Sequence, residues 1–377
     1  MTSRIRTMLV ASLIAGVALP SLARADGSVM LYGLIDSGLT YVSNQAGHST
    51  WLMQSGVNQN NRWGLRGQED LGGGMKTIFV LENGFDSMTG NLGQAGREFG
   101  RQAWVGLSTR YGSLTMGRQY DPVVDFVTPL SGVASFGSYG AHFGDLDNLL
   151  DTFRVDRSIK FRSTTVGGFS FEGLYSLGGT AGDFARNRVS SVGAGYTYGG
   201  LTLGAGYIRI DDPLTAVYDG RGTLDSAIVG KVPLQSAQRL DTAAAGASYS
   251  AGPATVGLVY TRVKFRQSDA VAGDATWQNV EVNGRYQLTP GLQLAAMYTF
   301  TRGKIDSTGA TPKYHQADIG VDYFLSKRTD VYLIGIYQKA SGTDSRNRDA
   351  VASINNQSSP SSNDRQAMVR IGYRHKF

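Results

Sequence analysis

Apolar residues alternate with small or polar residues along most of this chain. In the segment 292–300 the even positions are Leu, Leu, Ala, Tyr and Phe, whereas the odd positions include Gln293 and Thr299. The segments 254–261 and 316–325 repeat the pattern. Successive side chains of a β-strand point to opposite faces, so each segment is predicted to be a strand with one apolar face and one small or polar face.

Sixteen segments of this kind follow one another along the chain. Most contain about 9 to 12 residues, the length that a tilted strand needs to cross a bilayer. The predicted strands are 28–42, 60–70, 74–85, 98–108, 112–120, 156–163, 168–177, 188–198, 201–211, 239–250, 253–264, 276–287, 291–302, 315–325, 330–340 and 366–377.

Short and long connections alternate between these strands. Tight turns at one rim and long loops at the other are typical of an outer-membrane barrel, in which the turns face the periplasm. An even number of strands also lets the first strand pair with the last, which removes both sheet edges. We therefore predict an all-β fold, a transmembrane 16-stranded antiparallel β-barrel. The predicted long loops are 43–59, 86–97, 121–155, 178–187, 212–238, 265–275, 303–314 and 341–365.

The first 25 residues have a different pattern and are predicted to be a signal peptide. Arg4 and Arg6 precede an apolar run at 8–19, and Ala23-Arg24-Ala25 has the small-x-small form of a cleavage site. A membrane anchor is the alternative, but twelve apolar residues are fewer than the roughly 20 that a spanning helix needs. Residues 26–377 would then form the barrel.

The composition supports this interpretation and limits others. Glycine occurs 50 times in 377 residues, which suits many turns and small wall positions, and cysteine is absent. A soluble β-sandwich would also alternate, but it should bury large apolar side chains and expose charged ones. Beyond residue 25 there are 33 basic and 30 acidic residues, a net charge of +3. That charge is too small to indicate nucleic-acid binding, but basic groups in a lumen would favour anions.

Several segments, in order, resemble the Gram-negative general (trimeric) outer-membrane porins. They include VMLYGLIDSG at 29–38, NRWGLRGQEDLGGG at 61–74, FGRQAWVGL at 99–107 and GRQYD at 117–121. The resemblance implies a homotrimer whose third external loop, here 121–155, folds into the barrel. A terminal strand with Tyr373 and Phe377 resembles the signal that the barrel-assembly machinery reads.

The resemblance also implies the function. We expect a passive, constricted, water-filled channel for small polar solutes and ions in the bacterial outer membrane, with mild anion selectivity. The expected surroundings are outer-membrane lipids and lipopolysaccharide. No enzymatic activity, cofactor, metal site or nucleic-acid partner is expected.

Porins of this type set basic wall residues against acidic loop residues at the narrowest point, where the field orients dipolar solutes and biases ion choice. The basic wall candidates are Arg62, Arg66, Arg101, Arg118, Lys160 and Arg162. The acidic candidates are Glu82, Asp121, Asp125, Asp145, Asp147 and Asp151.

Two of the basic candidates need a local irregularity. Arg101 and Arg118 match positions of the family, yet strict alternation places them on the face of Ala103 and Leu114. We therefore expect them at a strand end or across a β-bulge. The family's loop tetrad Pro-Glu-Phe-Gly is absent from the chain, and the sequence at 135–138 resembles it only weakly.

Other functions remain open. A substrate-specific porin has the same pattern, and an adhesin or receptor would act through long loops such as 212–238 and 341–365. A barrel enzyme would need clustered catalytic side chains, whereas the four histidines are scattered and no G-x-S-x-G or phosphate-binding loop motif occurs. Asp211 and Asp212 leave calcium binding as a minor alternative.

Overall fold

A computed structural model describes residues 27–217, 237–267 and 273–377 of the chain. The predicted signal peptide, residues 1–25, and most of the predicted loop 212–238 lie outside the described residues. No helix in the described ranges is both long enough and apolar enough to span a membrane.

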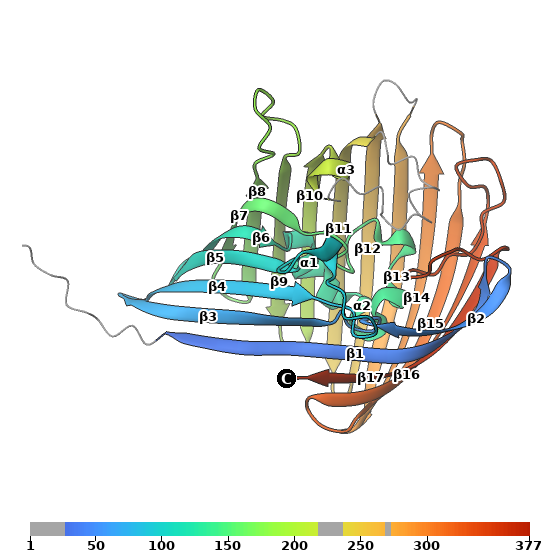
Figure 1. Ribbon diagram of the computed structural model, residues 1–377, viewed down its shortest axis with the longest axis horizontal. Helices are drawn as coiled ribbons and strands as arrows, with labels where there is room; N and C mark the ends of the chain where they lie inside the picture. Colours follow the sequence, from blue (N-terminus) through green and yellow to red (C-terminus); the bar gives the residue numbers. More distant parts are fainter. Residues whose placement is uncertain (1–26, 218–236, 268–272) are drawn as a thin grey trace, which may run out of the picture.

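The described residues form one antiparallel sheet that closes on itself (Figure 1). Apart from β2 and β3, which do not pair with each other, consecutive strands are paired, and β1 pairs with β17 from Leu34 opposite Lys376 to Val42 opposite Met368. The first and last strands therefore close the sheet. Its strands are β1 Ser28–Gln45, β2 His48–Ser55, β3 Arg62–Gly72, β4 Met75–Gly84, β5 Gln102–Thr109, β6 Gly112–Gln119, β7 Val155–Ser163, β8 Phe169–Ser176, β9 Val189–Tyr198, β10 Leu201–Asp211, β11 Ala237–Ala251, β12 Ala254–Gln267, β13 Ala275–Thr289, β14 Leu292–Ile305, β15 Lys313–Phe324, β16 Thr329–Ser341 and β17 Arg365–Lys376.

β2 and β3 occupy a single place in the wall, which gives a closed barrel of sixteen strands. Both pair with β1, one after the other, with Ser55 opposite Ser37 and Arg62 opposite Leu34. Residues 56–61 interrupt this composite strand. The sixteen-stranded antiparallel barrel predicted from the alternation is thus confirmed.

The predicted long loop 43–59 is wrong. β1 continues to Gln45, and a tight turn at Ala46 and Gly47 leads directly into β2. Both turn residues have positive φ, 53° and 100°, as a two-residue hairpin requires. The short alternating run of β2 was hidden among polar residues on both sides.

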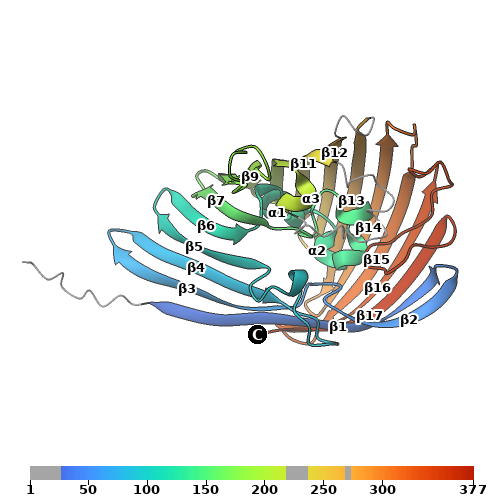
Figure 2. The same ribbon diagram turned by 45° about the horizontal axis from the view of Figure 1, so that its top comes forward.

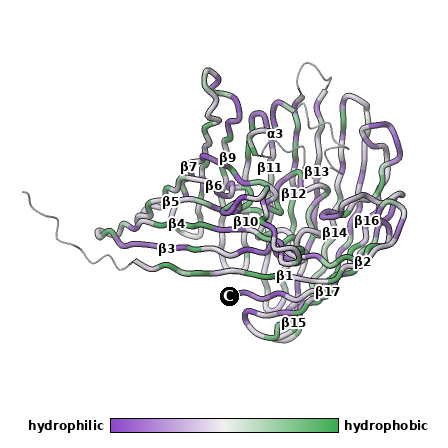
Figure 3. The backbone as a smooth tube through the Cα atoms, viewed as in Figure 1, coloured by the Kyte–Doolittle hydropathy of each residue, from purple (hydrophilic) through white to green (hydrophobic). Residues whose placement is uncertain are grey.

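One face of the sheet carries the exposed apolar side chains. On β13, Val280 and Val282 are exposed, whereas Glu281 between them is fully buried. Ile319 on β15 and Ile371 on β17 are more than half exposed on the same outer face. A continuous apolar outer band is what a bilayer covers. In Figure 3 the long connections at the top of the view are richer in hydrophilic residues than the strands.

Exposed tyrosines gather at the turn rim of this outer face. Tyr198, Tyr323 and Tyr373 are at least half exposed. Tyr198 and Tyr323 stand near strand ends that lead into short turns, and Tyr373 stands opposite Val331, near the start of β16 at the same rim. Such residues suit the polar boundary of a bilayer. Tyr32 differs, because its hydroxyl donates to the buried carboxylate of Glu82 at 2.9 Å and so points to the inner face.

The connection between β6 and β7 packs against the inner face. Figure 2 shows α1 and α2 on the concave side of the sheet. Two buried apolar clusters lie between this connection and the wall, one around Val123 and Leu149 and the other around Phe136 and Tyr139. Its short helices are α1 Pro122–Val127, η2 Thr128–Leu130, α2 Val133–Phe136, η3 Gly137–Gly140 and η4 Phe143–Asp145; elsewhere the chain forms η1 Gln94–Gly96 and α3 Pro213–Ala216.

Candidate functional site

Glycines in the wall let α1 lie directly on β9 and β10. A Cβ atom added to Gly204 would be 2.2 Å from the carbonyl oxygen of Phe126, and one on Gly206 would be 2.9 Å from the Cα of Val123. The GAGY sequences at 193–196 and 204–207 therefore supply small inward positions on which the helix rests. Here glycine is needed for close approach rather than for a turn.

Asp121 begins α1 and does not face the open lumen. Its carboxylate accepts a hydrogen bond from the backbone N–H of Val123 at 2.9 Å, and Pro122 occupies the first helical position. Both features are typical of a helix start. The side chain of Asn148 also donates to Asp121, at 3.1 Å. Burial raises the pKa of Asp121 to about 6.

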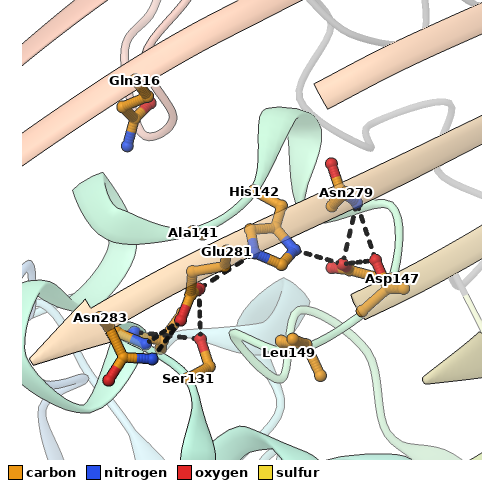
Figure 4. A network of polar contacts seen from close by, with 12 residues as sticks. Ser131, Ala141, His142, Asp147, Leu149, Asn279, Glu281, Asn283 and Gln316 are labelled. Carbon is orange, nitrogen blue, oxygen red and sulfur yellow. Dashed lines mark hydrogen bonds and ion pairs between the residues drawn. The ribbon is translucent and has the colours of Figure 1, made fainter. Parts of the chain in front are cut away.

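His142 joins this connection to the wall through two carboxylates (Figure 4). Its Nδ1 lies 2.6 Å from Asp147 and its Nε2 lies 3.0 Å from Glu281 on β13. Glu281 also accepts hydrogen bonds from the hydroxyl of Ser131 at 3.0 Å and the N–H of Gly132 at 2.7 Å. All these groups are buried.

The two carboxylates determine the charge of His142. Burial alone would lower the pKa of His142, but Asp147 and Glu281 raise it to about 10, so the ring is a cation at neutral pH. Asp147 is held further by Thr261 at 2.6 Å and Asn279 at 3.1 Å. The predicted acidic candidate Asp147 therefore serves as an attachment point.

Asp145 has a local role as well. Its carboxylate accepts hydrogen bonds from the N–H groups of Leu150 at 2.8 Å and Thr152 at 3.3 Å, which shapes the turn that follows η4. Burial, together with the neighbouring charge of Asp147, raises the pKa of Asp145 to about 8.

Three further contacts hold the same connection at other points of the wall. The side chain of Gln316 on β15 donates to the carbonyl of Tyr139 at 2.8 Å. The N–H of Ser138 donates to the carbonyl of Val57, in the interruption between β2 and β3, also at 2.8 Å. In addition, Asn355 from the β16–β17 connection donates to the carbonyl of Ala141 at 2.9 Å. The connection is thus fixed on several sides.

A charged cavity of about 550 Å³ lies between this connection and the wall formed by β3, β4 and β14–β17. Four basic and three acidic side chains line it, which leaves a formal charge of +1. They are Arg62, Arg101, Arg374, Lys376, Glu82, Asp151 and Asp322.

Arg101 is the most buried of these charges. Its Nε lies 2.8 Å from Glu82 and its Nη2 lies 3.5 Å from Asp151, which belongs to the β6–β7 connection. The same Nη2 donates to the hydroxyl of Tyr120 at 2.7 Å. Arg62 stands on the other side of Glu82, at 3.9 Å, and is more exposed to the cavity.

The sequence did not single out the second charged group of this cavity. Arg374 on β17 lies 3.0 Å from each of Asp322 and Asp330. The alternation of the last strand held the signal, because Arg374 and Lys376 share the face opposite the exposed Tyr373.

The remaining basic candidates lie elsewhere on the inner side. Lys160 is 2.6 Å from Asp125, and Arg162 is 3.0 Å from Glu172. Arg66 lies over the ring of Tyr32, 5.3 Å from its centroid. The predicted candidates that do not line the cavity are Arg66, Arg118, Lys160, Arg162, Asp121, Asp125, Asp145 and Asp147.

Arg101 and Arg118 lie at the two places where the alternation of inward and outward side chains is interrupted. Arg101 directly precedes β5, and the pairing of β6 with β7 shifts register between Gly117 and Gln119, at Arg118. Arg118 lies 2.6 Å from Asp156. A strand end and a bulge thus explain how both side chains leave the apolar face.

Throughout 27–217, 237–267 and 273–377, no group of three or more His, Asp or Glu side chains is arranged to hold an ion. Asp211, part of the minor calcium alternative, is paired with Arg188 at 3.0 Å and with Arg239 at 3.3 Å.

Comparison with known proteins identifies the family. The family model described as Gram-negative porin matches residues 10–343. The chain belongs to the Gram-negative porin family. An outer membrane porin protein of Bordetella pertussis is 29% identical over 89% of this chain and 94% of its own. Outer membrane porin protein 32 of Delftia acidovorans is 28% identical over 97% of this chain and 98% of its own.

Solved porin structures share the fold. An anion-selective porin from Comamonas acidovorans has a TM-score of 0.75 at 22% identity and covers 93% of this chain and 100% of its own. The trimer form of OmpT from Vibrio cholerae has a TM-score of 0.66 at 17% identity and covers 93% of this chain and 99% of its own. The porin is accordingly a channel protein of the bacterial outer membrane.

Proposed function

We propose that this porin forms a homotrimeric, passive diffusion channel for small polar solutes and ions, and that its constriction mildly favours anions. The β6–β7 connection would narrow each lumen, and the residues around Arg62 and Arg101 would set the charge at the narrow point. No chemical reaction is part of this function.

The observation that carries the proposal is the charged cavity against the β6–β7 connection. Its lining has a formal charge of +1, and Arg62 and Lys376 are its more accessible cations. A positive excess at a narrow, poorly screened point attracts anions and repels cations. The name of the Comamonas relative, an anion-selective porin, agrees with this expectation.

The trimer is supported by the solved relative named as a trimer form. The closed wall itself supports passive diffusion, since a barrel of this size leaves an aqueous channel. Tyr373 and Phe377 remain our proposal for the signal read by the barrel-assembly machinery. The main-chain N–H and carbonyl of Phe377 both pair with Gly33, each at 3.0 Å.

The test is electrical. Purified porin added to a planar bilayer should insert with stepwise conductance, in groups of three steps for a trimer, and a KCl gradient should give a reversal potential of the sign expected for chloride preference. A closed membrane despite confirmed insertion would refute the channel, whereas a cation-type potential would refute only its selectivity.

A further inference from the structure

A further cavity, of about 510 Å³, adjoins the charged cavity on the side of the long connections. It is lined by the β4–β5, β6–β7 and β16–β17 connections together with the interruption 56–61. Long connections lie on the extracellular side of outer-membrane barrels. Asn60 and Leu150 line both cavities, so a solute from outside meets this vestibule pocket before it reaches Arg62 and Arg101.

The vestibule pocket differs chemically from the charged cavity. Within the described residues, its lining contains no Lys or Arg. Six of its lining side chains are carboxamides: Asn60, Asn61, Gln94, Asn355, Asn356 and Gln357. A carboxamide both donates and accepts hydrogen bonds and carries no charge, so it can bind hydroxyl groups without selecting an ion of either sign.

The two carboxylates of the lining stabilise neighbouring turns. Asp86 accepts hydrogen bonds from the N–H of Met88 at 2.7 Å and from the hydroxyl of Ser55 at 2.9 Å. Asp145 accepts from the N–H of Leu150 at 2.8 Å. These N–H and O–H groups stabilise the carboxylates without a cation, while the carboxylates disfavour an anion in the pocket. The pocket therefore suits an uncharged solute.

Two of the lining carboxamides are only partly satisfied. Oδ1 of Asn61 accepts from the N–H of Asp36 at 2.7 Å, and Nε2 of Gln357 donates to the carbonyl of Asn356 at 3.0 Å. Among the described residues, the Nδ2 of Asn61 and the Oε1 of Gln357 then have no hydrogen-bond partner, although both atoms are buried. One is a donor and the other an acceptor. A hydroxyl group satisfies either kind, whereas an ion satisfies one kind alone.

Hydrogen bonds between the connections hold the walls of the vestibule pocket together. Asn355 donates to the carbonyl of His142 at 2.7 Å and accepts from the N–H of Gly144 at 2.8 Å. Phe85 and Leu150 are half-buried in the same lining and add apolar surface. A pre-formed cavity of a few hundred Å³ with apolar surface and placed polar groups is typical of a small-molecule site.

We propose that the vestibule pocket binds a neutral sugar, with its hydroxyl groups on the carboxamides and the C–H face of one ring against Phe85 and Leu150. The inference rests on the proposed channel function and names one class of solute that the channel takes up from outside. Conduction needs a site that binds strongly enough to collect the solute and weakly enough to release it. Uncharged hydrogen-bonding groups beside the constriction meet both requirements.

The test measures binding and block separately, with sucrose as the probe. For the full-chain porin in detergent, saturation-transfer NMR should detect contact with sucrose. In a planar bilayer, sucrose should lower the conductance saturably and by more than the fall in bulk conductivity. A polyethylene glycol of equal hydrodynamic size has almost no hydroxyl donors and should lower the conductance only in proportion to bulk conductivity.

Asn60→Ala/Gln357→Met removes two lining carboxamides. The concentration of sucrose that gives half-maximal block, measured against each protein's own sugar-free conductance, should rise on the order of tenfold, as expected for the loss of two hydrogen bonds. Asn356→Gly is a second variant that should act in the same direction, because glycine tolerates the φ of 62° at this position. Asn91→Ala/Gln278→Met is the matched control, since neither residue lines the pocket, and its half-blocking concentration should not change.

The outcomes distinguish this site from the channel function. A porin that conducts but neither contacts sucrose nor shows saturable block would overturn the site and leave the channel function standing. Half-blocking concentrations that are equal in the pocket variants and the unaltered porin, or equal block by the glycol, would also overturn it. Sucrose binding in detergent that both pocket variants weaken, without any conductance in the bilayer, would support the site and refute the channel function.

Discussion

The guanidinium of Arg101 lies 2.8 Å from the carboxylate of Glu82, and both side chains are almost fully buried. Breaking a buried ion pair from one side leaves the other charge without a partner, which typically costs about 3–5 kcal/mol. This pair also fixes Arg101 beside Asp151 of the β6–β7 connection. The ion pair therefore contributes both to the stability of the wall and to the charge that lines the cavity.

We predict that Arg101→Met lowers the free energy of unfolding by up to about 3–5 kcal/mol, because Glu82 stays buried with only Arg62, 3.9 Å away, as a neighbouring cation. Urea titrations of the refolded protein in detergent measure the change. Adding Glu82→Gln should recover part of the loss. Arg348→Met is the control, since its exposed pair with Asp344 should contribute no more than about 1 kcal/mol. A loss no larger than that of the control would show that the buried pair has no special cost.

Selectivity should follow the more accessible cations. Arg62→Gln/Lys376→Gln changes the formal charge of the cavity lining from +1 to about −1, so the ratio of chloride to potassium permeability should fall severalfold. Reversal potentials in a KCl gradient measure this ratio. Lys327→Gln/Arg328→Gln removes the same charge from the turn rim and should change it far less. An unchanged potential in the cavity variant would remove both residues from the constriction.

The attachment of the β6–β7 connection should weaken at high pH. The pKa of His142 is raised from its ordinary value of 6.5 to about 10. Its contribution to stability is therefore complete below about pH 6.5 and is lost as the pH rises through about 10. We expect current noise in single-channel records to increase between pH 8 and pH 10.5.

His142→Gln provides the comparison for this prediction. The variant lacks the titrating cation between Asp147 and Glu281, so it should be noisier at pH 8 and should change less between the two pH values. The same rise in noise in both proteins would assign the effect to other groups.

Because α1 packs closely on β10, a larger side chain at the contact should displace the helix and change the conductance. Gly204→Leu places side-chain atoms where the carbonyl of Phe126 lies, so the helix must move away from the wall. The single-channel conductance should change by tens of per cent, roughly in proportion to the lumen area that the helix then leaves or covers. Gly173→Leu is the control, because a Cβ at Gly173 meets no atom within 4 Å. Equal conductance in all three proteins would contradict the close contact.

The strands could be predicted from the sequence because every strand of a lipid-facing barrel wall alternates apolar outward side chains with small or polar inward side chains. β10, at Leu201–Asp211, begins and ends where the alternation does. β2 was missed because its short alternating run is flanked by polar residues on both sides, and the two-residue turn with positive φ at Ala46 and Gly47 lies among them. Residues 56–61 separate β2 from β3, so the predicted loop 43–59 was extended through β2 to this interruption.

The site was only partly predictable. Alternation and resemblance pointed to Arg62, Arg101, Glu82 and Asp151, which the structure brings together in one cavity. The sequence does not tell which carboxylates of the β6–β7 connection face the lumen. A solvated carboxylate and one that accepts hydrogen bonds from backbone N–H groups have the same sequence pattern. Asp145 is an example of the second kind.

Planar-bilayer recording of the purified porin tests the central claim most directly. Stepwise conductance, together with a reversal potential of the anion-selective sign in a KCl gradient, is the expected result. Confirmed membrane insertion without any ion current would contradict it.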